Sequence, residues 1–128
     1  MSGQIRRAVS LFEGYISVSE KRNDKTNTAI GLGNVATQQL ILGSLNLAER
    51  NLRRKIKLCR KKVVDDELFQ EAVGHQALGR VLSYRGAWHE AEQELLKSQK
   101  IFDGMGTVET NLGSGNWAYR SLHRLVIW

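Results

Sequence analysis

Three histidines and one cysteine are the residues of this 128-residue chain whose types could support catalysis or metal binding. His75, His89 and His123 are dispersed along the sequence, and Cys59 has no histidine at a helical spacing. No HExxH, CxxC or GxSxG motif is present, so neither a metal site nor an activated nucleophile is expected. The chain is therefore predicted not to be an enzyme and to need no metal or cofactor.

Two further patterns resemble functional sites but have simpler explanations. Asp65, Asp66 and Glu67 look like paired acids, although acids at this place also favour the first turn of a helix through its dipole. The segment 31–36, GLGNVA, matches the GxGxxA dinucleotide fingerprint. That fingerprint must follow a buried strand, whereas the polar segment NDKTNTA precedes it here, so nucleotide binding is not expected.

The formal net charge of +6 is concentrated in one segment. Between Leu45 and Lys62 there are eight basic residues and one acid, whereas the rest of the chain is nearly neutral. Six of the basic side chains lie opposite an apolar stripe on a helix, and we call them the basic outer stripe: Arg50, Arg53, Arg54, Lys57, Arg60 and Lys61. The stripe could bind phosphates or an anionic membrane surface, or serve only solvation. No aromatic residues interleave it to stack on bases, which disfavours nucleic acid.

The composition indicates one folded helical domain. With 41% hydrophobic and 25% charged residues, the chain can bury a core, but it fits a single compact unit. There is no proline to break a helix, and a single cysteine excludes an internal disulfide and fits a reducing compartment. The N-terminus has no apolar run that could be a signal peptide or membrane span. A cytoplasmic protein is expected.

Apolar residues recur at spacings of three and four along the chain, which predicts a series of amphipathic helices. The first helix is expected from Ile5 to about Arg22, and the second from the following turn to Gly43. The third should run from Ser44 to the RKKVVDD segment, and the fourth from Asp65 or Asp66 to Gly86. The fifth is expected around Trp88–Phe102 and the sixth from about Thr107 to Trp128. Asn23 or Asp24 and Ser44 are placed to cap helices. In the fifth helix Trp88 and Phe102 are predicted to be buried, and the GMG segment to end it.

The chain also repeats itself at a spacing of 43 residues. Sliding the sequence by this distance aligns Gly31 with Gly74, Gly43 with Gly86, Ala48 with Ala91, Glu49 with Glu92, Leu52 with Leu95 and Lys57 with Lys100. A period of about 20 to 50 residues is typical of solenoids, in which each unit buries its apolar face against its neighbours. Function in such an array is expected on a surface.

The repeated residues resemble the tetratricopeptide repeat, a helix-turn-helix unit, in a longer form than the common one. The second unit supplies the motif positions Leu78, Gly79, Leu82, Gly86, Ala91, Leu95 and Ser98, and the first supplies Val35, Ala36, Gly43, Ala48 and Leu52. Gln39 departs from the motif, which usually has a large apolar residue there. The resemblance implies an all-α fold, a right-handed α-α superhelix of about six antiparallel helices. The units are 24–63 and 64–104, between half units at 1–23 and 105–128.

In this family the first helices of successive units form a concave groove, and the matched motif implies which residues face it. They are Asn34, Thr37, Gln76, Arg80, Tyr84, Trp117, Arg120 and Arg124. Arginines and aromatic residues together suit a peptide that carries carboxylates. The lysine and asparagine clamp of the chaperone-binding members is absent, since its positions hold Gly33, Thr37, Ala77, Trp117 and Ser121. Alternatively, the arginines pair with neighbouring acids and bind no ligand.

Together these features predict a protein interaction module that binds a peptide or protein, with an acidic partner favoured, within a larger regulatory or scaffolding protein. The alternative is a basic-surface binder of nucleic acid or acidic lipid. The predicted last helix ends in the apolar segment LVIW, whereas arrays usually end in a polar capping helix. We therefore expect that the chain is a piece of a longer array, or that a partner or a second copy covers this end.

Overall fold

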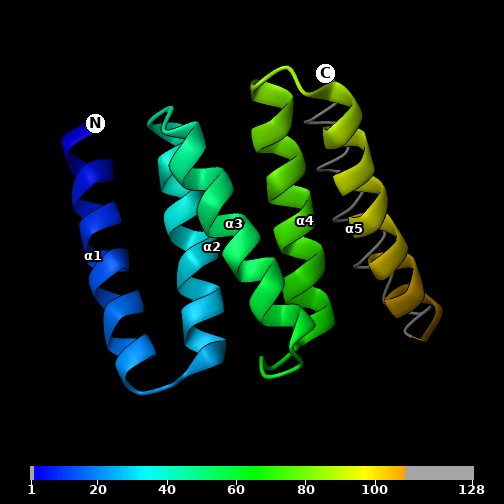
Figure 1. Cartoon of the computed structure of the whole chain (residues 1–128), viewed down its shortest axis with the longest axis horizontal. Coiled ribbons are helices and arrows are strands. Elements are labelled where there is room, and N and C mark those ends of the chain that lie inside the picture. Colours follow the sequence, from blue (N-terminus) through cyan, green and yellow to red (C-terminus); the bar gives the residue numbers. More distant parts are fainter. Residues whose placement is uncertain (1, 109–128) are drawn as a thin grey trace.

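The computed structural model describes residues 2–108, which form five α-helices joined by short turns (Figure 1). They are α1 (Ser2–Lys21), α2 (Lys25–Ile41), α3 (Leu45–Arg60), α4 (Glu67–Tyr84) and α5 (Trp88–Val108). No strand occurs among these residues, so the predicted all-α class is confirmed. The helix predicted from about Thr107 to Trp128 lies outside the described residues, except where α5 reaches its start.

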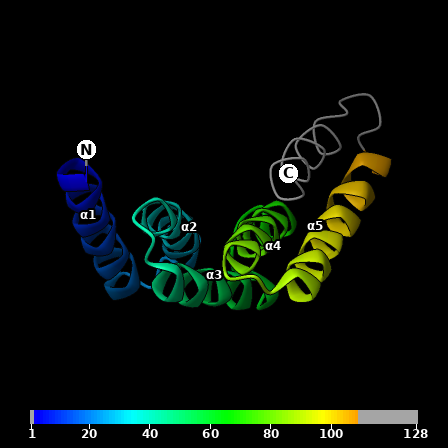
Figure 2. The same ribbon diagram turned by 90° about the horizontal axis from the view of Figure 1, so that it is seen from above.

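The helices form a curved arrangement in which neighbours along the chain run antiparallel (Figure 1). Seen from above, α2 and α4 lie on the inside of the curve, while α1, α3 and α5 form its outer side (Figure 2). Consecutive helices pack against each other, and α2 also contacts α4 directly. Within residues 2–108, the outer helices therefore cover α2 and α4 on the outer side of the curve and leave their inner side uncovered.

Glycine turns end both inner helices in the same way. Gly43 and Gly86 have φ angles of +79° and +81°, in the left-handed region that glycine enters without steric cost. The next residue then donates its N–H back five residues, from Ser44 to Gln39 at 2.8 Å and from Ala87 to Leu82 at 3.0 Å. This pattern satisfies helix-end carbonyls, so both predicted helix ends are confirmed.

The predicted helix starts are confirmed in position, but only one has the expected side-chain cap. Asp24 caps α2 by accepting a hydrogen bond from the Asn27 backbone N–H at 3.1 Å. Ser44 and Asp66 occupy the N-cap positions of α3 and α4, yet neither makes a side-chain capping bond. For Asp66 the reason is its left-handed backbone, with φ of 51°.

The sequence repeat reappears as a repeated contact between helices. Ile16 of α1 places its Cγ1 2.8 Å from where a Cβ on Gly31 would lie. Ile56 of α3 does the same at Gly74, with a distance of 2.9 Å. Both glycines therefore let an isoleucine of an outer helix approach the backbone of an inner helix. A continuous apolar cluster joins α2, α3, α4 and α5: Ala36, Ala48, Leu52, Ile56, Leu78, Val81, Leu82 and Ala91.

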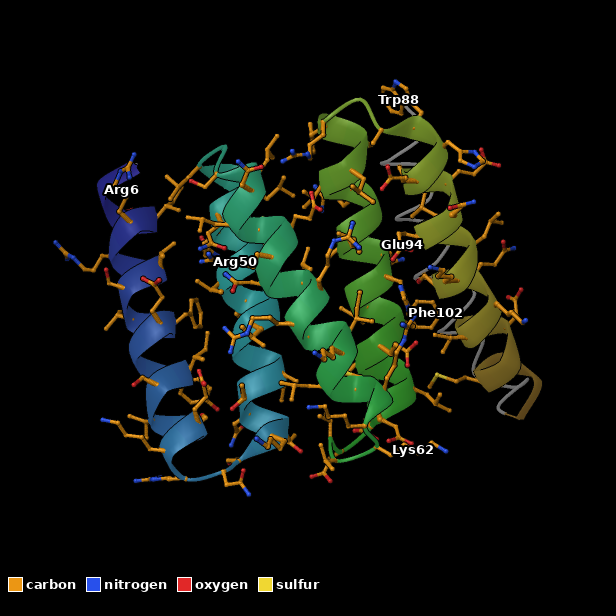
Figure 3. The ribbon with its side chains drawn as sticks, in the orientation of Figure 1. Arg6, Arg50, Lys62, Trp88, Glu94 and Phe102 are labelled. Carbon is orange, nitrogen blue, oxygen red and sulfur yellow. The ribbon has the colours of Figure 1, made fainter. Side chains whose placement is uncertain are left out.

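Two predictions for the fifth helix are wrong, and one is confirmed. Trp88 is 65% exposed and projects away from the start of α5 (Figure 3), because the first residue of that helix extends past its neighbours. Phe102 is buried as predicted, with an edge-to-face contact to Phe69. The GMG segment does not end the helix, since α5 continues to Val108. Its glycines weaken helix propensity without stopping the helix.

Candidate functional site

On α2, the side left uncovered by α1 and α3 carries the predicted groove residues. Asn34 and Thr37 are exposed, and Ile41 extends the same side with 61% of its surface exposed. The Thr37 hydroxyl donates to the Gly33 carbonyl at 3.0 Å, which orients the threonine along its own helix. Asn34 therefore offers the more available hydrogen-bonding group of the two.

On α4, the corresponding side carries an arginine and an exposed aromatic residue. Arg80 is half-buried, and no ion pair within residues 2–108 involves it. Tyr84, one turn further along, is 66% exposed. Gln76 is buried and is not available at the surface. The predicted groove residues Trp117, Arg120 and Arg124 lie outside the described residues. We call Asn34, Thr37, Ile41, Arg80 and Tyr84 together the inner face; Arg80 is half-buried and the other four are exposed.

The inner face lacks negative charge among the described residues. The sequence of α2 contains no acid, and its one charged residue is Lys25 at the helix start. The acids of α4 are Glu67, in its first turn, and Glu71, which contacts His75 and Arg60. A surface with an unpaired arginine and no neighbouring acid favours an anionic ligand.

Sequence reasoning missed one basic residue, Lys55: it counted Lys55 among the eight basic residues between Leu45 and Lys62 but gave it no role. In the structure Lys55 is only 3% exposed, although the six residues of the basic outer stripe are all exposed. Its Nζ lies 2.7 Å from where a Cβ on Gly33 would lie. Burial lowers the pKa of Lys55, while the neighbouring Cys59 acts in the opposite direction. The sequence signal was available, since Lys55 falls close to the apolar stripe of Leu52, Ile56 and Cys59.

The basic outer stripe is partly neutralised by acids. Arg53 pairs with Glu49 at 3.1 Å, Arg54 with Glu20 at 3.6 Å and Arg60 with Glu71 at 3.5 Å. Within residues 2–108, no ion pair involves the other three members of the stripe, Arg50, Lys57 and Lys61. Exposed pairs of this kind contribute little stability, but they reduce the positive field of the stripe.

A buried polar network joins α4 and α5 beneath the outer surface. His75 is 1% exposed, and its Nδ1 lies 2.9 Å from a Glu94 carboxylate oxygen while its Nε2 lies 3.0 Å from Glu71. Lys97 donates to the other Glu94 oxygen at 2.8 Å. Burial raises the pKa of Glu94, but hydrogen bonds and charge from His75 and Lys97 outweigh it and lower the pKa to about 2. This is a structural network, since every ring nitrogen already has a partner.

Hollows open at several places among the described residues, and two of them border the basic outer stripe. One of about 420 Å³ lies between α1 and α3 and includes Glu13, Glu20, Arg50 and Arg54, so its charges are mixed. A second, of about 290 Å³, lies between α3 and α5 beside the buried network and includes Lys57 and Lys97. Neither has an apolar lining with a few convergent polar groups, which is typical of small-molecule sites.

Residues 2–108 hold no group of three or more His, Cys, Asp or Glu placed to bind a metal ion. The two carboxylates on His75 contact opposite ring nitrogens, so they cannot converge on one ion with it. Cys59 is buried, and burial raises the pKa of its thiol, which lowers its nucleophilic reactivity.

Comparison with known proteins adds no relative from which to transfer a role. None of the five described helices combines the length and apolar character that a bilayer span requires. No protein-family model, curated protein or solved structure matches the chain at a significant level.

Proposed function

We propose that this chain is a protein interaction module that binds an acidic peptide or protein segment through its inner face. The observation that carries the proposal is a combination on one side of residues 2–108: Arg80 has no ion pair there, Tyr84 and Asn34 are exposed, and no acid of that part of the chain lies beside them. Arginine binds carboxylates through a planar pair of donors, and tyrosine gives flat contact area at low entropic cost. Its place would be within a larger regulatory or scaffolding assembly.

The proposal includes an architecture of tetratricopeptide type. Repeated glycine turns at Gly43 and Gly86, and repeated isoleucine contacts at Gly31 and Gly74, support a solenoid built from units of about 43 residues. In such an array the inner helices of successive units line one continuous surface. The proposed sixth helix, with Trp117, Arg120 and Arg124, would extend that surface beyond the described residues.

The test is affinity capture from the native host with paired charge reversals. Arg80→Glu with Arg124→Glu reverses charge on the proposed surface, whereas Arg53→Glu with Lys57→Glu reverses charge on the basic outer stripe. We expect the first pair to abolish capture of the partner and the second pair to leave it unchanged. Circular dichroism of both variants should match the native chain. Capture that survives the first pair would overturn the inner-face proposal.

The alternative function is binding of nucleic acid or acidic lipid by the basic outer stripe. It is favoured by the three stripe residues without an ion pair in residues 2–108, Arg50, Lys57 and Lys61. Such binding would weaken steeply with added salt. It would also be abolished by reversing Arg53, Arg54 and Lys57. The same capture experiment therefore separates the two functions.

A further inference from the structure

Lys55 extends from an outer helix toward the inside of the curve. It belongs to α3, which lies on the outer side of α2 and α4 in the view from above (Figure 2). Its Cδ lies 3.4 Å from the Cβ position of Gly33 on α2 and 3.9 Å from the Cβ position of Gly74 on α4. Two residues without side chains therefore flank the lysine stem, one on each inner helix.

The ammonium group at the end of this stem has no hydrogen-bond or ion-pair partner among the described residues. No hydrogen bond or ion pair within residues 2–108 involves Lys55 Nζ. Yet no fully buried side-chain nitrogen or oxygen in this part of the chain lacks a partner. The tip of Lys55 therefore keeps contact with solvent although the residue is only 3% exposed. It ends beside Gly33, which is half-buried and precedes Asn34 of the inner face.

Burying a lysine in this way is unfavourable for folding unless its charge serves to bind an anion. The methylene stem gains from burial, but an ammonium that loses most of its hydration without gaining an anion is unfavourable. A methionine of similar length would fill the same space without that cost. At half-buried Gly33 the Lys55 ammonium occupies the space that a Cβ would take, so it lies at the edge of the inner face, and no acid of α2 competes for it.

We propose that Lys55 binds a side-chain carboxylate of an acidic peptide lying on the inner face. The inference rests on the proposed function and adds a specific anchoring residue to it. The glycine at position 33 is part of this site, because any side chain there would meet the ammonium group. The site thus combines a buried lysine from an outer helix with half-buried Arg80 and exposed Asn34 of the inner helices.

The experiment measures binding of a fluorescent, C-terminally amidated 12-residue peptide of alternating Glu and Leu. The amide removes the terminal carboxylate, and a peptide with Gln in place of Glu is the control ligand. Wild-type protein should bind the Glu peptide at least tenfold more tightly. Lys55→Met should weaken this binding about 10- to 100-fold, the loss expected for one charge-assisted hydrogen bond. Lys57→Met, two residues away and exposed on the same helix, should have no effect.

A second variant tests whether the missing side chain at Gly33 is needed for binding. Gly33→Ala should weaken binding of the Glu peptide while leaving the melting temperature unchanged or higher. The new Cβ displaces only the flexible lysine tip, and alanine favours the helix more than glycine does. This combination separates loss of the site from loss of the fold.

The remaining outcomes decide between the two proposals. Equal weakening by Lys55→Met and Lys57→Met would show general attraction to positive charge and overturn the Lys55 site. If Lys55→Met binds like wild type while Arg80→Glu abolishes binding, the Lys55 site falls and the proposed function stands. A wild-type chain that does not distinguish the Glu from the Gln peptide also overturns the Lys55 site. The proposed function is then decided by the capture experiment.

Discussion

Replacing Glu94 with glutamine should reveal how much the buried polar network stabilises the fold. The side chain of Glu94 is 10% exposed and accepts hydrogen bonds from Lys97 at 2.8 Å and His75 at 2.9 Å. Lowering its pKa from 4.5 to about 2 corresponds to at most about 3 kcal/mol of stability. Glutamine keeps the shape of the side chain and one hydrogen-bond acceptor, and the half-exposed Lys97 contributes little to the stability. We therefore expect Glu94→Gln to be about 2 kcal/mol less stable than wild type at neutral pH.

The pH dependence distinguishes the charge from the shape of Glu94. Because its pKa is lower in the folded state, the stabilisation is complete above pH 4.5 and is lost as pH falls toward about 2. Roughly 2 kcal/mol of it should be gone by pH 3. Wild type and Glu94→Gln should therefore differ by about 2 kcal/mol at pH 7 and by less than about 1 kcal/mol at pH 3.

Urea unfolding followed by circular dichroism measures both differences. Glu92→Gln is the matched control, since Glu92 is exposed on the same helix, and it should change stability by less than about 0.5 kcal/mol at either pH. A Glu94→Gln variant as stable as wild type at pH 7 would refute the reasoning. A difference of the same size at both pH values would also refute it, because the loss would then not depend on the carboxylate charge.

Three further predictions concern packing and reactivity. Phe102→Ala should lower the free energy of unfolding in urea by about 3–5 kcal/mol, because the ring is buried, whereas Trp88→Ala should lower it by less than about 0.5 kcal/mol. Similar losses in the two variants would contradict the exposure of Trp88. Gly79→Ala should lower the free energy of unfolding by about 1–3 kcal/mol, since its Cβ would lie 3.0 Å from a leucine of α5. Gly104→Ala, with nothing within 4 Å of its Cβ, should raise it by up to about 1 kcal/mol. Stabilisation by both variants would show that α4 and α5 pack less closely. Cys59 should react with a disulfide reagent at least about tenfold more slowly in the native chain than in urea, because its thiol is buried; equal rates would mean that it is accessible.

Much of the fold could be predicted because its signals are local. The spacing of apolar residues and the glycines at 43 and 86 determine where helices lie and end, and these signals act within a few residues. The departure at Gln39 has a non-local explanation. Its Oε1 accepts a hydrogen bond from Asn51 at 2.9 Å, so both buried amides are satisfied. Sequence spacing alone does not reveal such a pair across two helices.

The candidate site was less predictable, because exposure depends on the neighbouring helices. Asn34 and Tyr84 are exposed on the inner helices as the repeat pattern implied, but Gln76 is buried. Lys55 was counted in the charge of its segment and given no role, since a single helix gives no reason to bury a lysine. The reason is the absence of side chains at Gly33 and Gly74 on two other helices, which lie far away in the sequence.

Amide chemical-shift mapping of the full chain with the amidated Glu and Leu peptide tests the central claim most directly. Binding through the inner face predicts shifts that cluster on α2 and α4, around Asn34, Thr37, Arg80 and Tyr84, and that disappear with the Gln peptide. Shifts that cluster instead on α3, around Arg50, Lys57 and Lys61, would contradict the account and assign binding to the basic outer stripe.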